Sequence, residues 1–418
     1  MITQLIINQT IKKVFGDISF ITPFEIKNPK SKAISLNVRI PFCRTQCSYC
    51  LFKNYPWYEK LGESYLKAVK KELELYSELL NGVKVESVYF SGGTPTVMPE
   101  GIAKIVEHIK NLFDYDGDTS IEANPIDLND KTLKVLIDAG VNRISIGVQS
   151  FNYNILKTIG RGHDGETAIS AIEKAKDFGF DYINIDLMFS LPEQKIEDVE
   201  HDLNIATKFE VQGISTYPLI LLPGTETYEY VRSGIMKLPT EKMEQKMYGT
   251  IIHHLTDLGY DMRALWSFAT KPENYCGPFE FEDYIGIGPN AWSLMNELFY
   301  LNTTSLKEYI RLLEDRKLPI EKGTIFTLKK MMKLWFMRKL YKIRVDRAQF
   351  YDRFKTNIDD ELRWIAVPLR LLGVIEFKNE SIELTRKGLF YASTATKEVS
   401  KRLLTRFYEP PAKAMPII

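Results

Sequence analysis

Cysteine is scarce in this chain, with only 4 Cys among 418 residues. Secreted domains that depend on disulfides are shorter and much richer in cysteine, so the sequence excludes that class. Three of the four cysteines, Cys43, Cys47 and Cys50, fall within one short segment. A cluster of this kind indicates a metal site rather than a set of disulfides.

Long apolar runs and a dominant charge are also missing. No stretch of about 18 apolar residues is present, so the sequence predicts no membrane span. The first residues lack the apolar core and cleavage site of a signal peptide, and we expect a cytoplasmic protein. The 55 Lys and Arg nearly balance the 54 Asp and Glu, which gives a formal net charge of +1. Without a global basic field, nucleic acid is not expected as a partner.

The hydrophobic pattern alternates between the strand period and the helix period from about residue 34 onward. Strands are predicted at residues 34–40, 85–90, 119–123, 143–148, 182–189 and 213–220. Helices are predicted at residues 64–80, 99–113, 130–139, 153–158, 166–178 and 196–208. Strands that alternate with helices pair in parallel through crossover connections. The sequence therefore predicts an α/β fold built on a partial (β/α)6 barrel.

Four segments are expected along the chain. Residues 1–33 form an N-terminal extension, and residues 34–235 form the barrel. Residues 236–320 form a less regular extension that completes the active site. Residues 321–418 form a mainly helical unit, in which helices precede a hairpin as in a winged-helix domain. The basic run 327–344 could suggest nucleic acid, but its helical spacing of apolar residues favours a core helix with a solvated basic face.

The loop after the first predicted strand reads IPFCRTQCSYC, with the spacing Cys43-x3-Cys47-x2-Cys50. Thiolates are soft ligands that suit iron–sulfur clusters and zinc. Three cysteines leave one iron of a [4Fe–4S] cluster open to a small molecule. Structural zinc usually takes four protein ligands, and only Cys276 or a distant histidine could supply the fourth. We therefore expect a [4Fe–4S] cluster, with zinc as the alternative.

Polar residues and glycines recur near the C-terminal ends of the predicted strands, where reactive groups gather in such folds. They are Gly92, Gly93, Thr94, Glu122, Asn124, Gln149, Arg161 and Asp186. Glycines let the backbone approach a ligand closely, and an arginine fork suits a carboxylate. Asp186 interrupts an apolar strand and needs a polar partner, such as a pair of ribose hydroxyls, because a buried charge is costly. Each of these residues could instead be a satisfied structural group.

The cysteine spacing, with Tyr49 just before the third cysteine, resembles that of the radical S-adenosylmethionine (SAM) superfamily. SGGTPT, EANP, RISIGVQSFN, IGRGH, NIDLMFSLPEQ, YPLILLPGT and YIGIGPNAWS follow over residues 34–293. Together these motifs resemble the oxygen-independent coproporphyrinogen III oxidase-like subgroup, which includes heme chaperones and class C radical SAM methyltransferases.

This resemblance implies that the cluster cleaves SAM to a 5′-deoxyadenosyl radical. It implies that Tyr49 and the polar residues and glycines of the strand ends line SAM. It also implies one or two SAM molecules, with Gly288 in the segment near the second. A tetrapyrrole or natural product is the implied substrate, and an electron donor such as flavodoxin or ferredoxin is the implied partner.

Two departures from the subgroup bear on the reaction. Phe52 stands where the decarboxylating oxidase carries another cysteine, and residues 266–286 lack the histidine typical of the heme chaperones. These departures favour an enzyme for SAM-dependent methyl or methylene transfer. A heme chaperone and an oxidase-like dehydrogenase remain as alternatives. Cys276 could be a heme ligand, a reactive thiol or a small buried residue.

Overall fold

The computed structural model describes residues 28–408 apart from residues 51, 53, 81 and 272–282, together with residues 20 and 26. Most of the expected N-terminal extension and Cys276 therefore lie outside the described residues. Within the described part, no helix combines the length and apolar character that crossing a bilayer requires.

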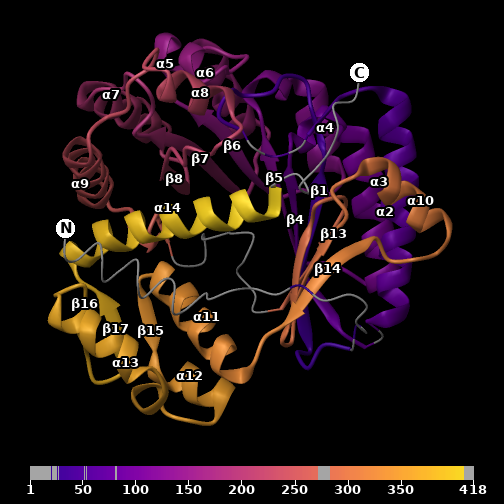
Figure 1. The fold of residues 1–418 in the computed structure, drawn as a ribbon. Helices are drawn as coiled ribbons and strands as arrows, with labels where there is room; N and C mark the ends of the chain where they lie inside the picture. Colours follow the sequence, from indigo (N-terminus) through magenta and orange to yellow (C-terminus); the bar gives the residue numbers. More distant parts are fainter. Residues whose placement is uncertain are drawn as a thin grey trace.

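Six parallel strands form the centre of the fold and follow one another in chain order (Figure 1). They are β1 (Ala33–Ile40), β4 (Lys84–Gly92), β5 (Asp118–Ala123), β6 (Arg143–Gln149), β7 (Tyr182–Phe189) and β8 (Gly213–Pro218). The helices between them are α2 (Glu59–Leu79), α3 (Pro99–Phe113), α4 (Asp130–Asp138), α5 (Tyr153–Thr158), α6 (Gly165–Asp177) and α7 (Ile196–Ala206). The predicted α/β fold with a central parallel sheet is confirmed.

The alternation of side chains along β1 shows how the strands separate two environments. Ile34, Leu36, Val38 and Ile40 are fully buried in the main hydrophobic core, which also contains apolar residues of the surrounding helices. The residues between them, Ser35, Asn37 and Arg39, are polar and also buried. Because successive side chains of a strand point to opposite faces, these polar groups turn to the inside of the barrel.

The sheet continues on both sides of the parallel strands, in a region predicted to be less regular. β11 (Tyr284–Ile287) pairs in parallel with β1. Beyond it, β12 (Trp292–Met295), β13 (Leu298–Asn302) and β14 (Ile320–Ile325) run antiparallel to their neighbours. At the other side, β10 (Ser267–Ala269) and β9 (Asp261–Ala264) follow β8. In the described part β9 and β14 are the two edges of this sheet, so the barrel stays open.

Short helices and strands complete the connections. They include α8 (Glu226–Arg232), α9 (Glu241–Asp257), which packs on α7 and β9, and α10 (Leu306–Glu314), which packs on α2. The two-residue strands β2 (Phe42–Cys43) and β3 (Tyr55–Pro56) pair in parallel in the connection after β1. Because β2 contains Cys43 and β3 follows Cys50, this pairing closes the loop that carries the cysteines.

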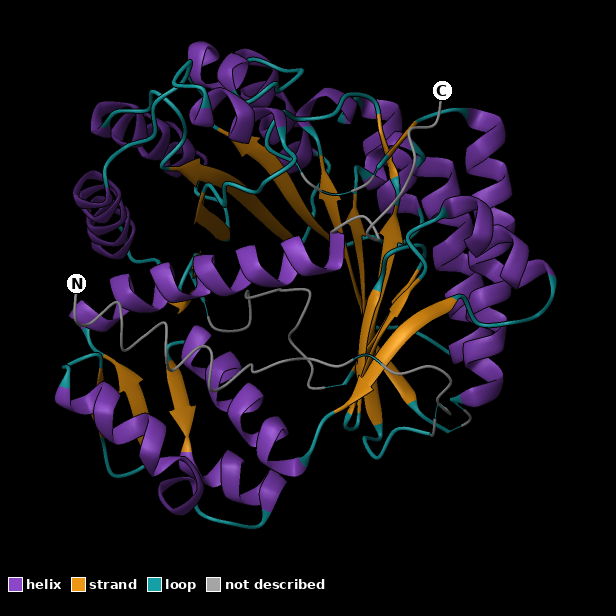
Figure 2. Cartoon of the chain, in the orientation of Figure 1, coloured by secondary structure: helices purple, strands orange, loops and turns teal. Residues whose placement is uncertain are grey.

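A C-terminal unit lies beside the open sheet (Figure 2). Its elements are α11 (Leu328–Tyr341), β15 (Arg344–Asp346), α12 (Arg347–Phe354), α13 (Ile358–Leu371), β16 (Ile375–Phe377), β17 (Ser381–Leu384) and α14 (Arg386–Tyr408). β16 and β17 form the predicted hairpin, and β15 adds a third strand. The order of helices and strands is that of a winged-helix unit. From it, α14 runs back across the opening toward the barrel (Figure 1).

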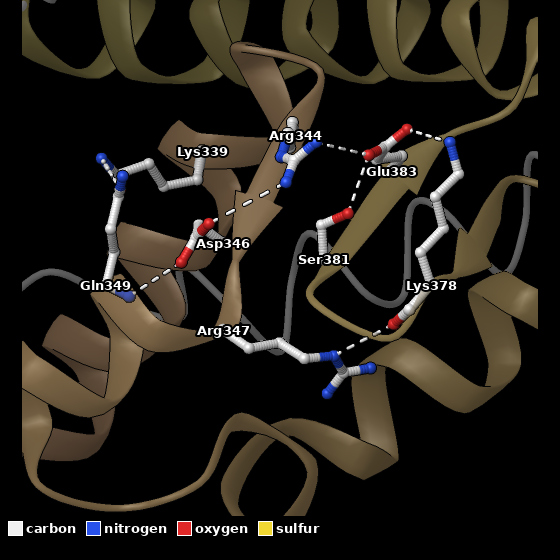
Figure 3. A network of polar contacts seen from close by, with 8 residues as sticks. All are labelled: Lys339, Arg344, Asp346, Arg347, Gln349, Lys378, Ser381 and Glu383. Carbon is white, nitrogen blue, oxygen red and sulfur yellow. Dashed lines mark hydrogen bonds and ion pairs between the residues drawn. The ribbon is translucent and has the colours of Figure 1, made fainter.

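Charged side chains tie the hairpin to the rest of the C-terminal unit (Figure 3). The Glu383 carboxylate accepts hydrogen bonds from Arg344 at 3.2 Å, from Lys378 at 2.5 Å and from Ser381 at 2.7 Å. These donors, led by Lys378, lower the pKa of Glu383. Arg347 of α12 reaches the Lys378 carbonyl at 3.4 Å, so the turn of the hairpin is held to the neighbouring helix.

Candidate functional site

The connection after β1, here called the cysteine loop (residues 41–50), carries three half-buried cysteines. A different polar side chain approaches each sulfur. The Thr94 hydroxyl lies 3.5 Å from the Sγ of Cys43, and Arg161 Nη1 lies 3.4 Å from the Sγ of Cys47. Asn54 Nδ2 lies 4.0 Å from the Sγ of Cys50. Burial raises the pKa of Cys43 and takes that of Cys50 to about 11.

Contacts with distant elements hold the cysteine loop in place. Arg44 Nε donates to Asp127 Oδ1 at 2.6 Å, and the Asp127 carboxylate is buried. The Ser48 amide donates to the Ile159 carbonyl at 3.1 Å. The Ser48 and Thr227 hydroxyls lie 2.8 Å apart, and the Thr227 amide donates to the Ser48 carbonyl. Because these partners come from the third, fourth and sixth βα connections, the loop is placed by the whole barrel.

The surroundings of the cysteines leave room and hydrogen-bond donors for a ligand. In the described residues, no three His, Cys, Asp or Glu side chains converge on a point that could hold one metal ion. A Cβ added at Gly93 would lie 2.8 Å from the Sγ of Cys43, so the glycine leaves space beside the sulfur. The buried Nε atoms of Arg39 and Arg161 have no hydrogen-bond partner among the described residues. Space and unpaired donors together suit a ligand with several acceptors.

The segment Gly92–Thr94 lies against the cysteine loop through its backbone. Gly92 has φ +122°, and a Cβ there would lie 2.4 Å from the Ile40 carbonyl oxygen. The Gly93 amide donates to Ile40 and the Thr94 amide to Phe42, each at 2.7 Å. The sequence suggested that both amides and carbonyls of this segment could face a ligand. An ammonium group can only donate, so it is the carbonyl oxygens of this segment that could accept from a ligand ammonium group, while these two amides are engaged within the protein.

Two half-buried carboxylates, Glu122 of β5 and Asp186 of β7, face the inside of the barrel. The Tyr89 hydroxyl donates to Glu122 at 3.2 Å. Asp186 accepts from the Ser145 hydroxyl at 3.0 Å and from Asn184 Nδ2 at 2.8 Å. Burial raises the pKa of Glu122 to about 7, with a further rise from Asp186. Burial also raises the pKa of Asp186 to about 6, although its hydrogen bonds oppose the rise.

The end of β6 is irregular at Gln149. This residue has φ +69°, a backbone conformation that is rare outside glycine. The pairing of β6 with β7 shifts between Gly147 and Gln149, which marks a bulge. The Tyr217 hydroxyl of β8 donates to Gln149 Oε1 at 2.8 Å. Arg161 Nη2 donates to the Gly147 carbonyl, so the bulge orients both the amide and the guanidinium groups.

One cavity of about 930 Å³ collects most of the predicted site residues. Those that line it are Cys43, Tyr49, Cys47, Cys50, Gly92, Gly93, Thr94, Glu122, Asn124, Gln149, Arg161 and Asp186. The cavity continues past the barrel, where residues of β12, β13, α11 and α14 complete its wall. We call it the central cavity. Of the predicted site residues, Gly288 is not among those that line it.

Gly288 instead belongs to a buried network behind β1. Its amide donates to Glu72 Oε2 of α2 at 2.8 Å, and a Cβ at Gly288 would lie 2.5 Å from the Arg39 carbonyl oxygen. Glu72 also accepts from Tyr309 at 2.5 Å and from Asn302 at 2.7 Å. The glycine therefore allows a close crossing of two backbone segments. Its sequence motif carried no sign of this packing role.

Three residues at the site were missed from the sequence: Asn54 and Tyr89 line the cavity, and Arg39 lies beside it. Arg39 and Asn54 lie beside the cysteine loop and hydrogen-bond each other at 3.2 Å, and Tyr89 lies beside Glu122. The sequence did carry a signal that could have identified two of them, because Arg39 and Tyr89 alternate with apolar residues along a strand. His163, by contrast, lies beside the cavity wall and bonds the Val148 carbonyl at 3.1 Å. Burial, with Arg161 nearby, lowers the pKa of His163 to about 4.

Comparison with known proteins adds an independent line of evidence. Residues 37–206 match the model of the radical SAM superfamily. The chain is 28% identical over 362 residues to the heme chaperone HemW of Bacillus subtilis, covering 85% of this chain and 96% of that protein. It is 30% identical over 382 residues to HemW of Buchnera aphidicola, covering 88% and 98%.

Among solved structures, coproporphyrinogen III oxidase (HemN) from Escherichia coli is similar, with a TM-score of 0.76 and 22% identity. The match covers 88% of this chain and 90% of that one, so it supports the same fold over the C-terminal unit as well as the barrel. The extent of these matches and the cysteine motif agree. The chain belongs to the radical SAM superfamily, in the subgroup related to HemN and HemW.

Proposed function

We propose that this chain is a heme-binding radical SAM protein of the heme chaperone type. Membership of the superfamily implies a [4Fe–4S] cluster and SAM. The observation that carries the proposal is the central cavity, which joins the cysteine loop to a wall of mainly apolar side chains from the C-terminal unit. A volume of about 930 Å³ lies at the upper end of the range of about 300–1,000 Å³ for small-molecule pockets.

Cys43, Cys47 and Cys50 would hold the cluster, and the cavity side of the strand ends would hold SAM. When bound and reduced by a donor, the cluster would supply the electron that cleaves SAM. Arg161 would bind the SAM carboxylate with its planar fork. Carbonyl groups of the Gly92–Thr94 segment would accept from the SAM ammonium. The remaining lining residues proposed for SAM are Tyr49, Glu122, Asn124, Gln149 and Asp186.

The names of the relatives help to choose between a heme chaperone and a methyl-transfer enzyme. Methyl transfer, which the sequence favoured, gains no specific support from the proteins compared above, and two of them are heme chaperones by name. We therefore propose a heme chaperone as the main function. Methyl transfer remains as an alternative outcome of the test. An electron donor such as flavodoxin or ferredoxin would be needed wherever the cluster cleaves SAM, whereas a second SAM belongs to the methyl-transfer alternative.

The test is an anaerobic heme titration of protein reconstituted with iron and sulfide and reduced with dithionite, with SAM present. We expect heme to bind at about one per chain, with little or no S-adenosylhomocysteine formed. A triple variant, Cys43→Ala with Cys47→Ala and Cys50→Ala, should lose the iron while remaining folded. If heme does not bind, the chaperone proposal is wrong. Formation of 5′-deoxyadenosine together with S-adenosylhomocysteine would favour the methyl-transfer alternative.

A further inference from the structure

A positive charge is buried beside the cysteine loop, on Arg39 of β1. We propose that Arg39 is a positioning residue that, together with Asn54, raises the reduction potential of the iron–sulfur cluster on the cysteine loop. The inference rests on the proposed ligation of that cluster by the three cysteines of the loop, and it is independent of heme binding. It names residues that act on the cluster without being its ligands.

Arg39 is a buried cation that has no counter-ion among the described residues. It is 9% exposed and belongs to the polar residues of β1 that turn to the inside of the barrel. It makes no ion pair with a described carboxylate, and its Nε atom has no hydrogen-bond partner in that part of the chain. Because a buried charge is costly without a partner, a negative group is expected nearby.

Two residues that follow Cys50 contact the Arg39 side chain. The guanidinium group lies 4.9 Å from the centre of the Phe52 ring, and Arg39 Nη2 donates to Asn54 Oδ1 at 3.2 Å. Phe52 and Asn54 line the central cavity, whereas Arg39 lies behind them. Phe52 also stands where the decarboxylating oxidase carries a further cysteine. In this chain that position packs on a buried cation instead of offering another thiolate.

The contact with Arg39 fixes the orientation of the Asn54 amide. A guanidinium group has only donors, so Asn54 must present its oxygen to Arg39. The NH2 group of Asn54 is then the one that faces Cys50, with Nδ2 4.0 Å from Sγ. A thiolate is an acceptor, so Arg39 directs a hydrogen-bond donor at a sulfur that would hold the cluster.

Contacts with the backbone and with the stem of the side chain give Arg39 a fixed position. The Tyr65 hydroxyl donates to the Arg39 carbonyl at 2.7 Å. A Cβ at Gly288 would lie 2.5 Å from the same carbonyl oxygen, and one at Gly92 would lie 2.9 Å from Arg39 Cγ. These glycines leave the space that the backbone and side chain of Arg39 occupy. A charge held in this way needs little reorganisation when the charge of its neighbour changes.

The charge of Arg39 acts on both ends of the cysteine loop. Burial raises the pKa of Cys43 and that of Cys50, and Arg39 opposes the rise at each of them. Reduction adds one electron, supplied by an external donor, to a cluster that three thiolates would hold, and no bond is made or broken. A nearby positive charge and hydrogen bonds to the sulfurs both favour the more negative, reduced state. Loss of the cation should therefore make the cluster harder to reduce.

Two other charged residues face the same region of the barrel. Arg161 approaches Cys47, and Arg39 opposes the rise that burial causes in the pKa of Glu122. Both Arg161 and Glu122 are proposed to bind SAM. A measurement without SAM therefore keeps changes in SAM binding apart from the effect of Arg39 on the cluster.

The experiment is an anaerobic redox titration of the cluster-loaded full chain without SAM, followed by the EPR signal of the reduced cluster. Arg39→Gln should lower the equilibrium constant for reduction about tenfold, a fall of about 59 mV in the midpoint potential. Arg39→Lys keeps the charge and should recover most of that fall. Asn54→Leu keeps the cation, removes the donor to Cys50 and should lower the constant about threefold. Lys60→Gln removes an exposed cation of α2 and, as the control, should leave the potential unchanged.

Circular dichroism and the iron content confirm that each variant is folded and loaded. An unchanged or higher potential in Arg39→Gln, or an unchanged one in Asn54→Leu, overturns the inference. An equal fall in Arg39→Lys and Arg39→Gln also overturns it, because the charge would not be the cause. Loss of iron in every Arg39 and Asn54 variant has the same consequence, since these residues would then serve assembly of the site. If the wild type takes up no cluster, the proposed function fails as well.

Discussion

Glu72 is a buried carboxylate that joins elements far apart in the sequence. It is 0% exposed and accepts hydrogen bonds from Gly288, Asn302 and Tyr309, more than 200 residues away. All three partners are donors, so the site suits a group with two acceptor oxygens. Through these bonds α2 is tied to the β11–β12 turn, to β13 and to α10.

Replacement Glu72→Gln should destabilise the protein by about 2–3 kcal/mol, because the new amide NH2 would face a buried donor and leave it unsatisfied. The free energy of unfolding in urea measures the change. Glu78→Gln provides the control on the same helix, since Glu78 pairs with Arg316 at an exposed position. The control should change stability by less than about 0.5 kcal/mol. Equal effects of the two substitutions would contradict the role assigned to Glu72.

The raised pKa of Glu72 predicts that the free energy of unfolding depends on pH. Burial raises the pKa of Glu72 from its ordinary value of 4.5 to about 7. Between these values the folded state holds a proton that the unfolded chain has released, so this contribution to stability falls as the pH rises through that window. The difference in unfolding free energy between wild type and Glu72→Gln should therefore shrink from about pH 5 to about pH 7 and then level off. A difference that grows with pH would refute this assignment.

At the scale of elements, the cysteine loop depends on a hydroxyl pair with α8. Thr227 is fully buried, and its hydroxyl lies 2.8 Å from that of Ser48, between Cys47 and Cys50. Thr227→Val removes this hydrogen bond, worth about 1 kcal/mol, and keeps the shape of the side chain. Loss of iron to a chelator should become about fivefold faster. Thr256→Val, an exposed position on α9, should leave the rate unchanged. An unchanged rate in Thr227→Val would show that the loop does not need this contact.

α14 is the second element whose position depends on few contacts. Lys397 is about three-quarters buried and pairs with Glu244, which also accepts from Ser190 at 2.6 Å. Lys397→Met should raise amide hydrogen exchange in α14 about fivefold if the pair contributes about 1 kcal/mol. Arg402→Met breaks the Arg402–Glu398 pair within α14 and is the control. Equal exchange in the two variants would mean that the anchor to α9 is dispensable.

At the scale of the whole molecule, charge argues against nucleic acid as the partner of the winged-helix unit. The net charge is +1, and the first turn of α13 carries Asp359, Asp360 and Glu361. α13 holds the position of the recognition helix in DNA-binding winged-helix domains, where carboxylates would repel phosphates. We expect no shift of duplex DNA at about 10 µM protein and about 150 mM salt. Tight, salt-dependent binding in a mobility-shift assay would contradict this expectation.

The sequence by itself determined the features that depend on local patterns. The spacing of Cys43, Cys47 and Cys50 predicted the cysteine loop, and alternating periods predicted the parallel strands. Together, the cysteine motif and the strand-end motifs predicted twelve residues that share one cavity. Strand ends of a parallel sheet meet at one edge, so a residue's place in the strand order is enough to bring it there.

Only the tertiary structure decided features that depend on contacts between distant segments. Arg39 and Tyr89 look like ordinary strand residues until the barrel turns them inward. Gly288 carries a motif near the predicted site, but its amide is engaged by Glu72 of α2. Likewise, the winged-helix pattern gave no sign that α14 would complete the cavity wall. Gly288 and Glu72 are 216 positions apart. No local periodicity encodes contacts of this kind, because they depend on the path of the folded chain.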